Sequence, residues 1–463
     1  MSPSDKTNFH LDLEHPDGRE VLCKSSIMNV MKRFEQIFAY GLLVIFTGIV
    51  VHAPLSVWLG TIFPDYALLI KSWKEILMLL LVPVAIVLVT HRKLWAEFSR
   101  DWIFRLLIAY AVLHLIILAF LWPGVAQAAA GLAIDLRYVL FFGLVYTLIR
   151  IVPEYKKPAI MTAIGGAVVV LGFAAMQLFL PANILTHIGY GDSTIQPYLT
   201  VDMNPDYVRV NSTLRGPNPL GAYAGMVLAL VAAFLLLKKR RANDQKIVVL
   251  AGLLAVCGSV ALWISYSRSS VVAGIIGVLV VITSARLRKI PRIVQVASVA
   301  VVLIGSMTLF ALRDSSFVTN VILHDDPNVG GSVSSNQGHV DSLAAGLGRV
   351  VEQPFGAGIG STGSASLLGT DGIIIENQYL FIAHEAGWLG LALYICIFGL
   401  VMWRLWRLRK DWLALGVFAG GVGLALIGLL QPVWADDTVS MIWWGLAAIA
   451  IIAKERNGRQ STK

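Results

Sequence analysis

The sequence has few charged residues and almost no cysteine, and both shortages exclude whole classes of protein. Asp, Glu, Lys and Arg make up 14% of the 463 residues, against roughly 25% in soluble domains. The three cysteines, Cys23, Cys257 and Cys396, lie in the polar N-terminal stretch and within two apolar runs. This spacing fits neither a disulfide framework nor a zinc site. With 57% hydrophobic residues, the chain is predicted to be a polytopic membrane protein.

Several chemical signatures are also missing. There is no Walker motif, so ATP hydrolysis has no support. No Asp-x-Asp motif occurs in a predicted outer loop, and the adjacent pairs Asp325-Asp326 and Asp436-Asp437 have no obvious partners. The polar N-terminal stretch lacks the apolar core and cleavage site of a secretory signal. We therefore expect no metal, no cofactor, no nucleotide and no cleaved leader.

The sequence does contain a series of apolar runs long enough to cross a bilayer, each of about 17–25 residues. We expect about twelve transmembrane helices in an all-α bundle, with both termini in the cytoplasm. The domains expected are a cytoplasmic tail (1–35), a transmembrane domain (36–453) and a second cytoplasmic tail (454–463). The runs lie near 37–59, 75–90, 102–122, 128–149, 158–180, 219–237, 246–265, 269–285, 293–312, 377–403, 412–430 and 438–453.

Two predicted outer loops are long. The first covers about 181–218, and the second, between spans nine and ten, covers about 313–376 and is rich in Gly, Ser, Asn and Asp. A loop of that length without strong periodicity commonly carries function. Within the second loop, residues 340–352 are predicted to form an amphipathic helix against the membrane. Five tryptophans near predicted span ends fit aromatic belts: Trp58, Trp122, Trp434, Trp443 and Trp444.

Most basic residues gather at alternate ends of the spans, as in Lys238-Lys239-Arg240-Arg241, and mark the cytoplasmic face. The rules of membrane insertion give no reason for the basic residues on or near the opposite face, so we expect function among them. These are Lys71, Lys74, Arg137, Arg209, Arg215, Arg268, Arg313 and Arg349.

Three of these arginines are candidates for binding an anionic substrate. Arg215 precedes Gly216-Pro217-Asn218-Pro219, where two prolines impose a turn, and a guanidinium held there suits phosphate oxygens. Arg268 lies in a tight turn between two spans, where a cation is costly unless it faces a polar cavity or an anion. For both, the alternative is contact with lipid headgroups. Arg137, inside the fourth span, either pairs with Asp135 or contacts substrate.

The second loop and the span after it contain two candidate bases. His339 titrates near neutral pH and suits proton transfer or phosphate binding, although a lone loop histidine is more often solvated. Glu376 lies where a span begins, so burial would favour general-base work; its ordinary role would be a carboxylate opposing the helix dipole. The glycines of 356–360 permit close backbone approach.

Taken together, these stretches resemble the O-antigen ligase and polymerase superfamily of bacterial membrane proteins. Arg215-Gly216-Pro217-Asn218 matches the family's arginine turn, Ser267-Arg268-Ser269 its hairpin, and 354–360 its Pro-x-Gly-x-Gly-x-Gly element. Glu376 occupies the position of a family histidine. The stretch around it otherwise keeps the family's register at Asn377, Tyr379, Leu380, Gly387 and Gly390.

The resemblance implies a metal-independent enzyme of cell-surface polysaccharide synthesis. Such enzymes transfer glycan from a polyprenyl-diphosphate carrier to an acceptor hydroxyl at the outer face of the cytoplasmic membrane, as ligases or polymerases. The implied partners are therefore the lipid-linked glycan, a glycan or lipid acceptor and the membrane, without nucleic acid. The base would be Glu376 or His339. The implied substrate-binding residues are Arg215, Arg268, Arg209, Arg137, Asn377 and Tyr379.

Two other functions remain open on the sequence. A transporter or flippase for an anionic solute or a lipid-linked glycan would need polar residues along a path to the inner face. The inner halves of the predicted spans are apolar instead. A membrane scaffold would use the large loop to bind a partner protein.

Overall fold

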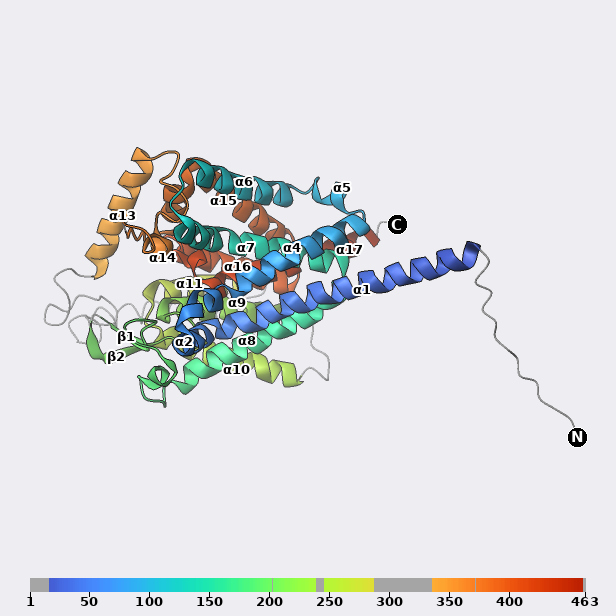
Figure 1. Cartoon of the computed structure of the whole chain (residues 1–463). Coiled ribbons are helices and arrows are strands. Elements are labelled where there is room, and N and C mark those ends of the chain that lie inside the picture. The colour runs from blue at the N-terminus through green and yellow to red at the C-terminus, as the bar shows by residue number, and fades with distance from the viewer. Residues whose placement is uncertain (1–15, 202, 239–244, 287–334, 371, 461–463) are drawn as a thin grey trace, which may run out of the picture.

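The chain is a mostly helical, multi-pass membrane protein (Figure 1). A computed structural model describes residues 16–201, 203–238, 245–286, 335–370 and 372–460. Within these ranges, nine helices are long and apolar enough to cross a membrane, and two shorter apolar helices, Trp412–Ile427 and Asp437–Ile452, accompany them. The prediction of a polytopic helical bundle is therefore confirmed.

The first long span is a composite: α1 (Pro16–Gly48) continues through a 3₁₀ turn, Ile49–Val51, into α2 (His52–Ile62). The remaining spans are single helices. In chain order they are α4 (Trp73–His91), α6 (Trp102–Phe120), α7 (Val125–Ile151), α8 (Lys156–Met176), α9 (Pro217–Leu237), α10 (Gln245–Ile264), α11 (Arg268–Arg286), α15 (Gln378–Arg407), α16 (Trp412–Ile427) and α17 (Asp437–Gln460). Shorter helices are α3 (Ala67–Lys71), α5 (Trp95–Phe98), α13 (Ser335–Glu352) and α14 (Gly363–Ser366).

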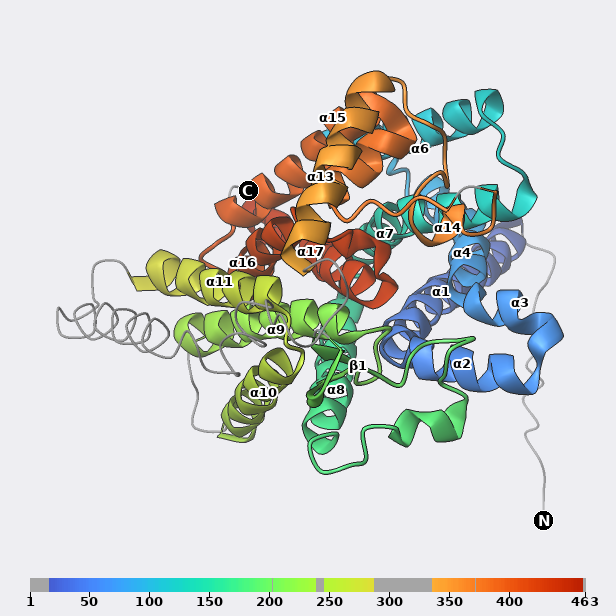
Figure 2. The ribbon, with the colours of Figure 1, turned by 90° about the vertical axis from the view of Figure 1, so that its left-hand side faces the viewer.

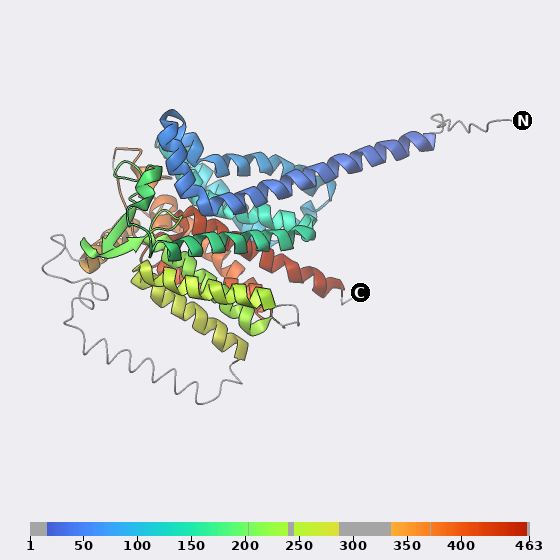
Figure 3. The same cartoon turned by 90° about the horizontal axis from the view of Figure 1, so that it is seen from below.

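Eleven of the twelve predicted spans coincide with these helices, and the one expected at 293–312 lies outside the described residues. α11 ends at one end of the bundle and α13 lies at the other (Figures 1 and 3). Helix extends into both expected tails, because α1 begins at Pro16 and α17 continues to Gln460; the division into tails and transmembrane domain stays a prediction.

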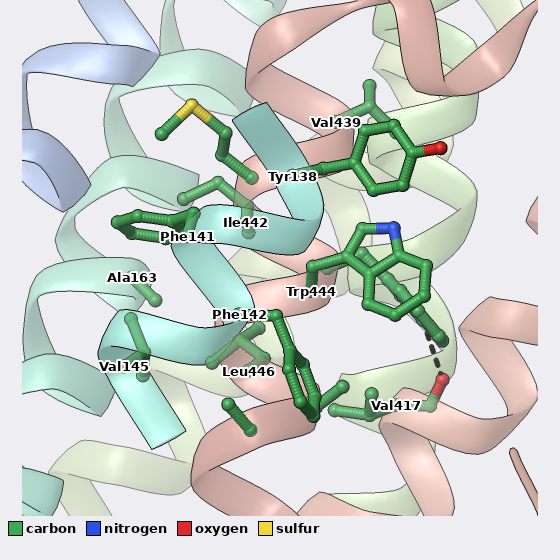
Figure 4. Packing of buried hydrophobic residues seen from close by; sticks show 14 of the residues in the cluster. Tyr138, Phe141, Phe142, Val145, Ala163, Val417, Val439, Ile442, Trp444 and Leu446 are labelled. Atoms are coloured by element: carbon green, nitrogen blue, oxygen red, sulfur yellow. Dashed lines mark hydrogen bonds between the residues drawn. The ribbon is translucent and has the colours of Figure 1, made fainter. Parts of the chain in front are cut away.

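The core of the bundle is built around α7 and α17, which pack against each other, while α9 packs against α10, α11 and α16. Figure 4 shows Tyr138 and Phe142 of α7 around Trp444 of α17, with ring centroids 5.4 Å and 5.7 Å from the indole. Trp434, Trp443 and Trp444 are at most 1% exposed, so placing these three in an aromatic belt was wrong. They fill the protein interior, where large aromatic rings contribute most packing area.

One end of the bundle carries most of the non-spanning structure, and it faces the viewer in Figure 2. Here an antiparallel hairpin pairs β1 (Tyr198–Val201) with β2 (Asn204–Val210). The all-α prediction missed these strands. The predicted amphipathic helix appears as α13, which lies across the end of the bundle (Figure 1).

Candidate functional site

Arg209 joins the two turns that carry the other candidate arginines. Its Nε donates to the backbone oxygen of Ser265 at 2.9 Å, and its Nη2 donates to Asn218 Oδ1. Ser265 lies three positions before Arg268, which begins α11, and Asn218 lies three positions after Arg215. A single side chain on β2 therefore brings the Arg215 turn and the Arg268 turn together.

The turn that carries Arg215 is anchored to the C-terminal part of α8. Ser212 adopts a positive φ of 53°, and its amide donates to Gln177 Oε1 at 2.8 Å while its hydroxyl donates to Val170 O at 2.6 Å. Pro217 then starts α9, a position where proline costs no hydrogen bond and presets φ. Arg215 itself is exposed, so a fixed backbone presents a solvent-accessible guanidinium.

The turn that carries Arg268 is held by hydroxyl groups. The Ser267 amide donates to Ser265 Oγ at 3.2 Å, and Ser267 Oγ lies 2.9 Å from Ser270 Oγ. Between them, Tyr266 has a positive φ of 48°, so the chain reverses within very few residues. Arg268 is half-buried directly after this reversal.

Asp436, the first residue of the Asp436-Asp437 pair, lies close enough to Arg215 and Arg137 for their charges to act on its carboxyl group. It directly precedes α17, and its Oδ1 accepts from the Val439 amide at 2.9 Å. Burial, together with the neighbouring charge of Asp437, raises the pKa of the Asp436 carboxyl to about 6, while Arg215 and Arg137 act in the opposite direction. Its sequence signal is an acidic pair directly before an apolar span; its partners only became visible in three dimensions.

Arg137 is buried and takes part in an ion network rather than facing open solvent. Its Nη1 lies 3.5 Å from Glu75 Oε1 and 3.9 Å from Asp437 Oδ2, and its Nη2 donates to Ala435 O. The proposed pairing with Asp135 is therefore replaced by partners from two other helices. Residues two positions apart on a helix point in different directions, which explains the separation.

Lys74 completes this network, and the charges within it cancel. Its Nζ lies 3.1 Å from Asp437 Oδ2 and 3.3 Å from Glu75 Oε2. Trp73 Nε1 donates to His52 Nδ1 at 3.0 Å. His52 Nε2 lies 3.0 Å from Lys74 Nζ and 3.1 Å from Asp437 Oδ2, so this ring also belongs to the network. Lys74 is 2% exposed, and its ion pair with Asp437 attaches the start of α4 to the start of α17.

Glu376 is exposed and lies immediately before α15. Asn377 and Tyr379, which the resemblance implies for substrate binding, instead form hydrogen bonds within the protein. Asn377 caps α15 by accepting from the Tyr379 amide at 2.9 Å, and its Nδ2 donates to Leu429 O at 2.7 Å. The Tyr379 hydroxyl donates to Ala425 O at 2.9 Å. These contacts attach the start of α15 to the end of α16.

The start of α15 is also tied to the segment that leads to Asp436. The Gln378 amide donates to Gly428 O at 2.8 Å, and Gln378 Oε1 accepts from the Trp434 amide at 2.7 Å. Glu376 and Asp436 thus flank one hydrogen-bonded junction. His339 lies on α13, and its side chain is outside the described part of the structure.

The glycines of the 356–360 segment approach the protein's own helices. A Cβ at Gly356 would lie 2.6 Å from Glu385 O, and one at Gly360 would lie 2.7 Å from Gln127 O. Both residues have positive φ, +88° and +80°, which favours glycine on steric grounds. The close approach expected from the sequence is therefore an approach to α15 and α7.

Chemically, this end of the bundle combines three guanidinium groups near its surface with two carboxylates at the start of the last helices. The guanidinium groups suit the binding of a negatively charged group, and the carboxylates suit the acceptance of a proton from a second reacting group. Within the described ranges, no group of three or more His, Cys, Asp or Glu residues has the arrangement of a metal site.

Comparison with known proteins gives little further definition. No protein-family model matches the chain, and no curated protein matches it. Among solved structures, it is similar to one described as "Structural coordination of polymerization and crosslinking by a peptidoglycan synthase complex". That match covers 77% of this chain and 98% of the other, with 17% sequence identity and a TM-score of 0.43. A similarity this distant identifies neither a family nor an activity.

Proposed function

We propose that the chain is a membrane glycosyltransferase that moves glycan from a polyprenyl-diphosphate carrier to an acceptor hydroxyl. The reaction takes place at the outer face of the cytoplasmic membrane, where it ligates or polymerises cell-surface polysaccharide. The observation that carries the proposal is the bridge made by Arg209, which contacts Ser265 O and Asn218 Oδ1 and so unites the turns of Arg268 and Arg215.

In this reaction the bond between the sugar carbon and the carrier phosphate breaks, and a new bond forms from that carbon to the acceptor oxygen. Negative charge develops on the departing diphosphate, and guanidinium groups already held in place stabilise it without reorganising. Arg215 and Arg268 are assigned this role, and Arg209 holds their two turns in position.

The acceptor hydroxyl passes its proton to a carboxylate during the same step. Glu376 remains the candidate base from the sequence, with His339 as its alternative, and Asp436 joins them. A carboxyl with a pKa of about 6 is largely ionised at neutral pH and still basic enough to accept a proton. The charge of Arg215 also acts on the Asp436 carboxyl, so the acceptor and the leaving group would meet at the same end of the bundle.

The test is Arg268→Ala in a cell that depends on this chain for its surface glycan. We expect loss of glycan transfer of at least about 100-fold, the magnitude seen when one preorganised donor to a transition-state charge is removed. Surface glycan profiles on gels measure it, with membrane protein levels checked by immunoblot. Loss of long chains with short units still attached to the acceptor identifies a polymerase, whereas full-length chains left on the carrier identify a ligase.

Arg409→Ala is the matched control, because Arg409 is an exposed arginine after α15 that stacks on Trp406. It should leave the glycan profile unchanged. Normal polymer in the Arg268→Ala strain, with the protein present at wild-type level, would remove the basis for the proposed reaction.

A further inference from the structure

Helix α15 is broken at Gly387, and the glycine-rich segment repairs the break. Gly387 has φ 68° and ψ −175° inside the helix, so the carbonyls of the preceding turn lose their helical partners. The Ala357 amide donates to His384 O at 2.6 Å, and the Gly358 amide donates to Glu385 O at 3.3 Å. Backbone groups of the loop thus occupy the acceptors that the break exposes.

The same segment also packs against α7. A Cβ at Gly131 would lie 2.6 Å from the Gly360 nitrogen, so this glycine lets the loop backbone touch the helix. Gln127 Nε2 donates to Gly360 O at 2.9 Å. The segment is therefore inserted between α7 and α15.

Two acidic side chains face each other beneath this insertion. Asp135 of α7 and Glu385 of α15 are 5% and 1% exposed, their carboxyl groups interact with each other, and the Gly360 amide contributes a hydrogen bond to Glu385. Glu385 Oε1 accepts from the Thr362 amide at 3.1 Å. Within the described structure, Asp135 Oδ2 and Glu385 Oε2 are buried without any donor.

Among the described residues, no side chain donates to these two oxygens. From α6, His114 Nδ1 lies 2.8 Å from Tyr110 O, and a carbonyl only accepts, so Nδ1 carries the proton. His114 Nε2 is 3.6 Å from Asp135 Oδ2, beyond hydrogen-bonding distance. Tyr110 and the neighbouring Tyr138 of α7 are the other titratable groups at the pair. Two ionised carboxylates in contact inside a protein repel each other strongly.

We propose that Asp135 and Glu385 form a buried proton-binding site, in which one shared proton joins the two carboxyl groups and keeps the 356–362 segment inserted between α7 and α15. The proton supplies the missing donor and removes one negative charge from the interior. When it leaves, the two carboxylates repel, and Glu385 withdraws from the Thr362 amide.

Thr362 connects the proton-binding site to the stretch that carries Glu376, the candidate base. Thr362 Oγ1 donates to Ile373 O at 3.0 Å and accepts from the Ile375 amide at 3.2 Å, and Ile375 immediately precedes Glu376. Glu385 is therefore a positioning residue for this stretch. The proton site itself stands whether or not the chain transfers glycan, because it is defined by contacts among buried groups.

Thermal unfolding of the full-length chain in detergent, followed from mildly acidic to strongly alkaline pH, tests the proposal. The folded wild-type protein keeps a proton that the unfolded chain has already released, so its stability should fall as pH rises.

Glu385→Gln and Asp135→Asn each replace the shared proton by an amide N–H. Both should fold at neutral pH and lose this fall in stability with rising pH. Glu385→Ala leaves Asp135 and the Thr362 amide without a partner and should be destabilised. Glu352→Gln, an exposed carboxylate on α13, is the control and should keep the wild-type profile.

Infrared spectroscopy provides an independent readout. At neutral pH the wild-type protein should show the carbonyl band of a protonated carboxylic acid, and each single amide variant should lack it, because the remaining carboxylate then ionises. A fall in stability with rising pH that persists unchanged in both amide variants, or a wild-type protein without the band, would show that the pair does not share a proton. Failure of the Arg268→Ala experiment would leave these results unaffected.

Discussion

At Asp436, burial and a nearby guanidinium act on the same carboxyl in opposite directions, and burial prevails. The pKa rises from its usual 3.8 to about 6, which corresponds to about 3 kcal/mol against the ionised form in the folded protein. Between those two values the folded chain holds more proton than the unfolded chain. Stability from this residue therefore falls as pH rises from about 4 to about 6.

Asp436→Asn should remove that fall. The amide oxygen can still accept from the Val439 amide, so the cap is kept, and at neutral pH the variant should be more stable by about 1–3 kcal/mol. Near pH 4, where the aspartate is protonated in the folded protein, the difference should shrink towards zero. Melting curves in detergent over this pH range measure the difference in stability.

If Asp436 also accepts a proton in catalysis, the more stable Asp436→Asn variant loses transfer activity. Equal stability of the two proteins at neutral pH would refute the cost assigned to burial.

At the scale of the element, the break in α15 depends on one glycine. Gly387 has a φ that L side chains rarely adopt, and a Cβ there would lie 2.6 Å from Phe355 C and 2.7 Å from Pro354 O. Both obstacles are backbone atoms, which cannot rotate aside as a side chain can. The Trp388 amide donates to Pro354 O at 3.0 Å, so the loop and the second half of α15 are held together directly after the break.

Gly387→Ala should therefore destabilise the protein by about 2–4 kcal/mol, from backbone strain and overpacking together. Gly399→Ala is the matched control in the same helix, since a Cβ there meets nothing within 4 Å. It should be neutral or stabilising by up to about 1 kcal/mol. Thermal shift in one detergent compares the two variants. Similar melting temperatures for both would show that the break does not require glycine.

At the scale of the whole molecule, the bundle has two different ends. The hairpin, α13 and the beginning of α9 lie at one end, whereas α5 and the end of α17 lie at the other (Figure 1). We predict that the first end lies at the outer face of the cytoplasmic membrane, because the sequence places the basic clusters at the ends of the spans that face the cytoplasm. Lys74 and Arg137 are buried within their ion network, which keeps their charges off the lipid-facing surface between the two ends of the bundle.

Cysteine accessibility tests this orientation. In a background with Cys23, Cys257 and Cys396 replaced, Ser193→Cys and Ser99→Cys place single thiols at exposed positions near the two ends. A membrane-impermeant maleimide should label Ser193→Cys on intact spheroplasts and Ser99→Cys only after the membrane is permeabilised. The reverse pattern would put the Arg215 and Arg268 turns in the cytosol and would rule out transfer at the outer face.

The sequence alone determined the class of the protein and the position of eleven helices, because crossing a bilayer demands a local, continuous apolar run that is visible in one dimension. It also singled out Arg215 and Arg268, since cations at such places violate the rules of insertion; their catalytic role stays a prediction. Only the tertiary structure decided the partners of Lys74, Arg137, Asp135 and Glu385, and the place of Asp436. Lys74 and Asp437, for example, are far apart along the chain, and no local pattern records that their charges meet. Burial makes such pairing obligatory, but which helix supplies the partner depends on how the whole bundle packs.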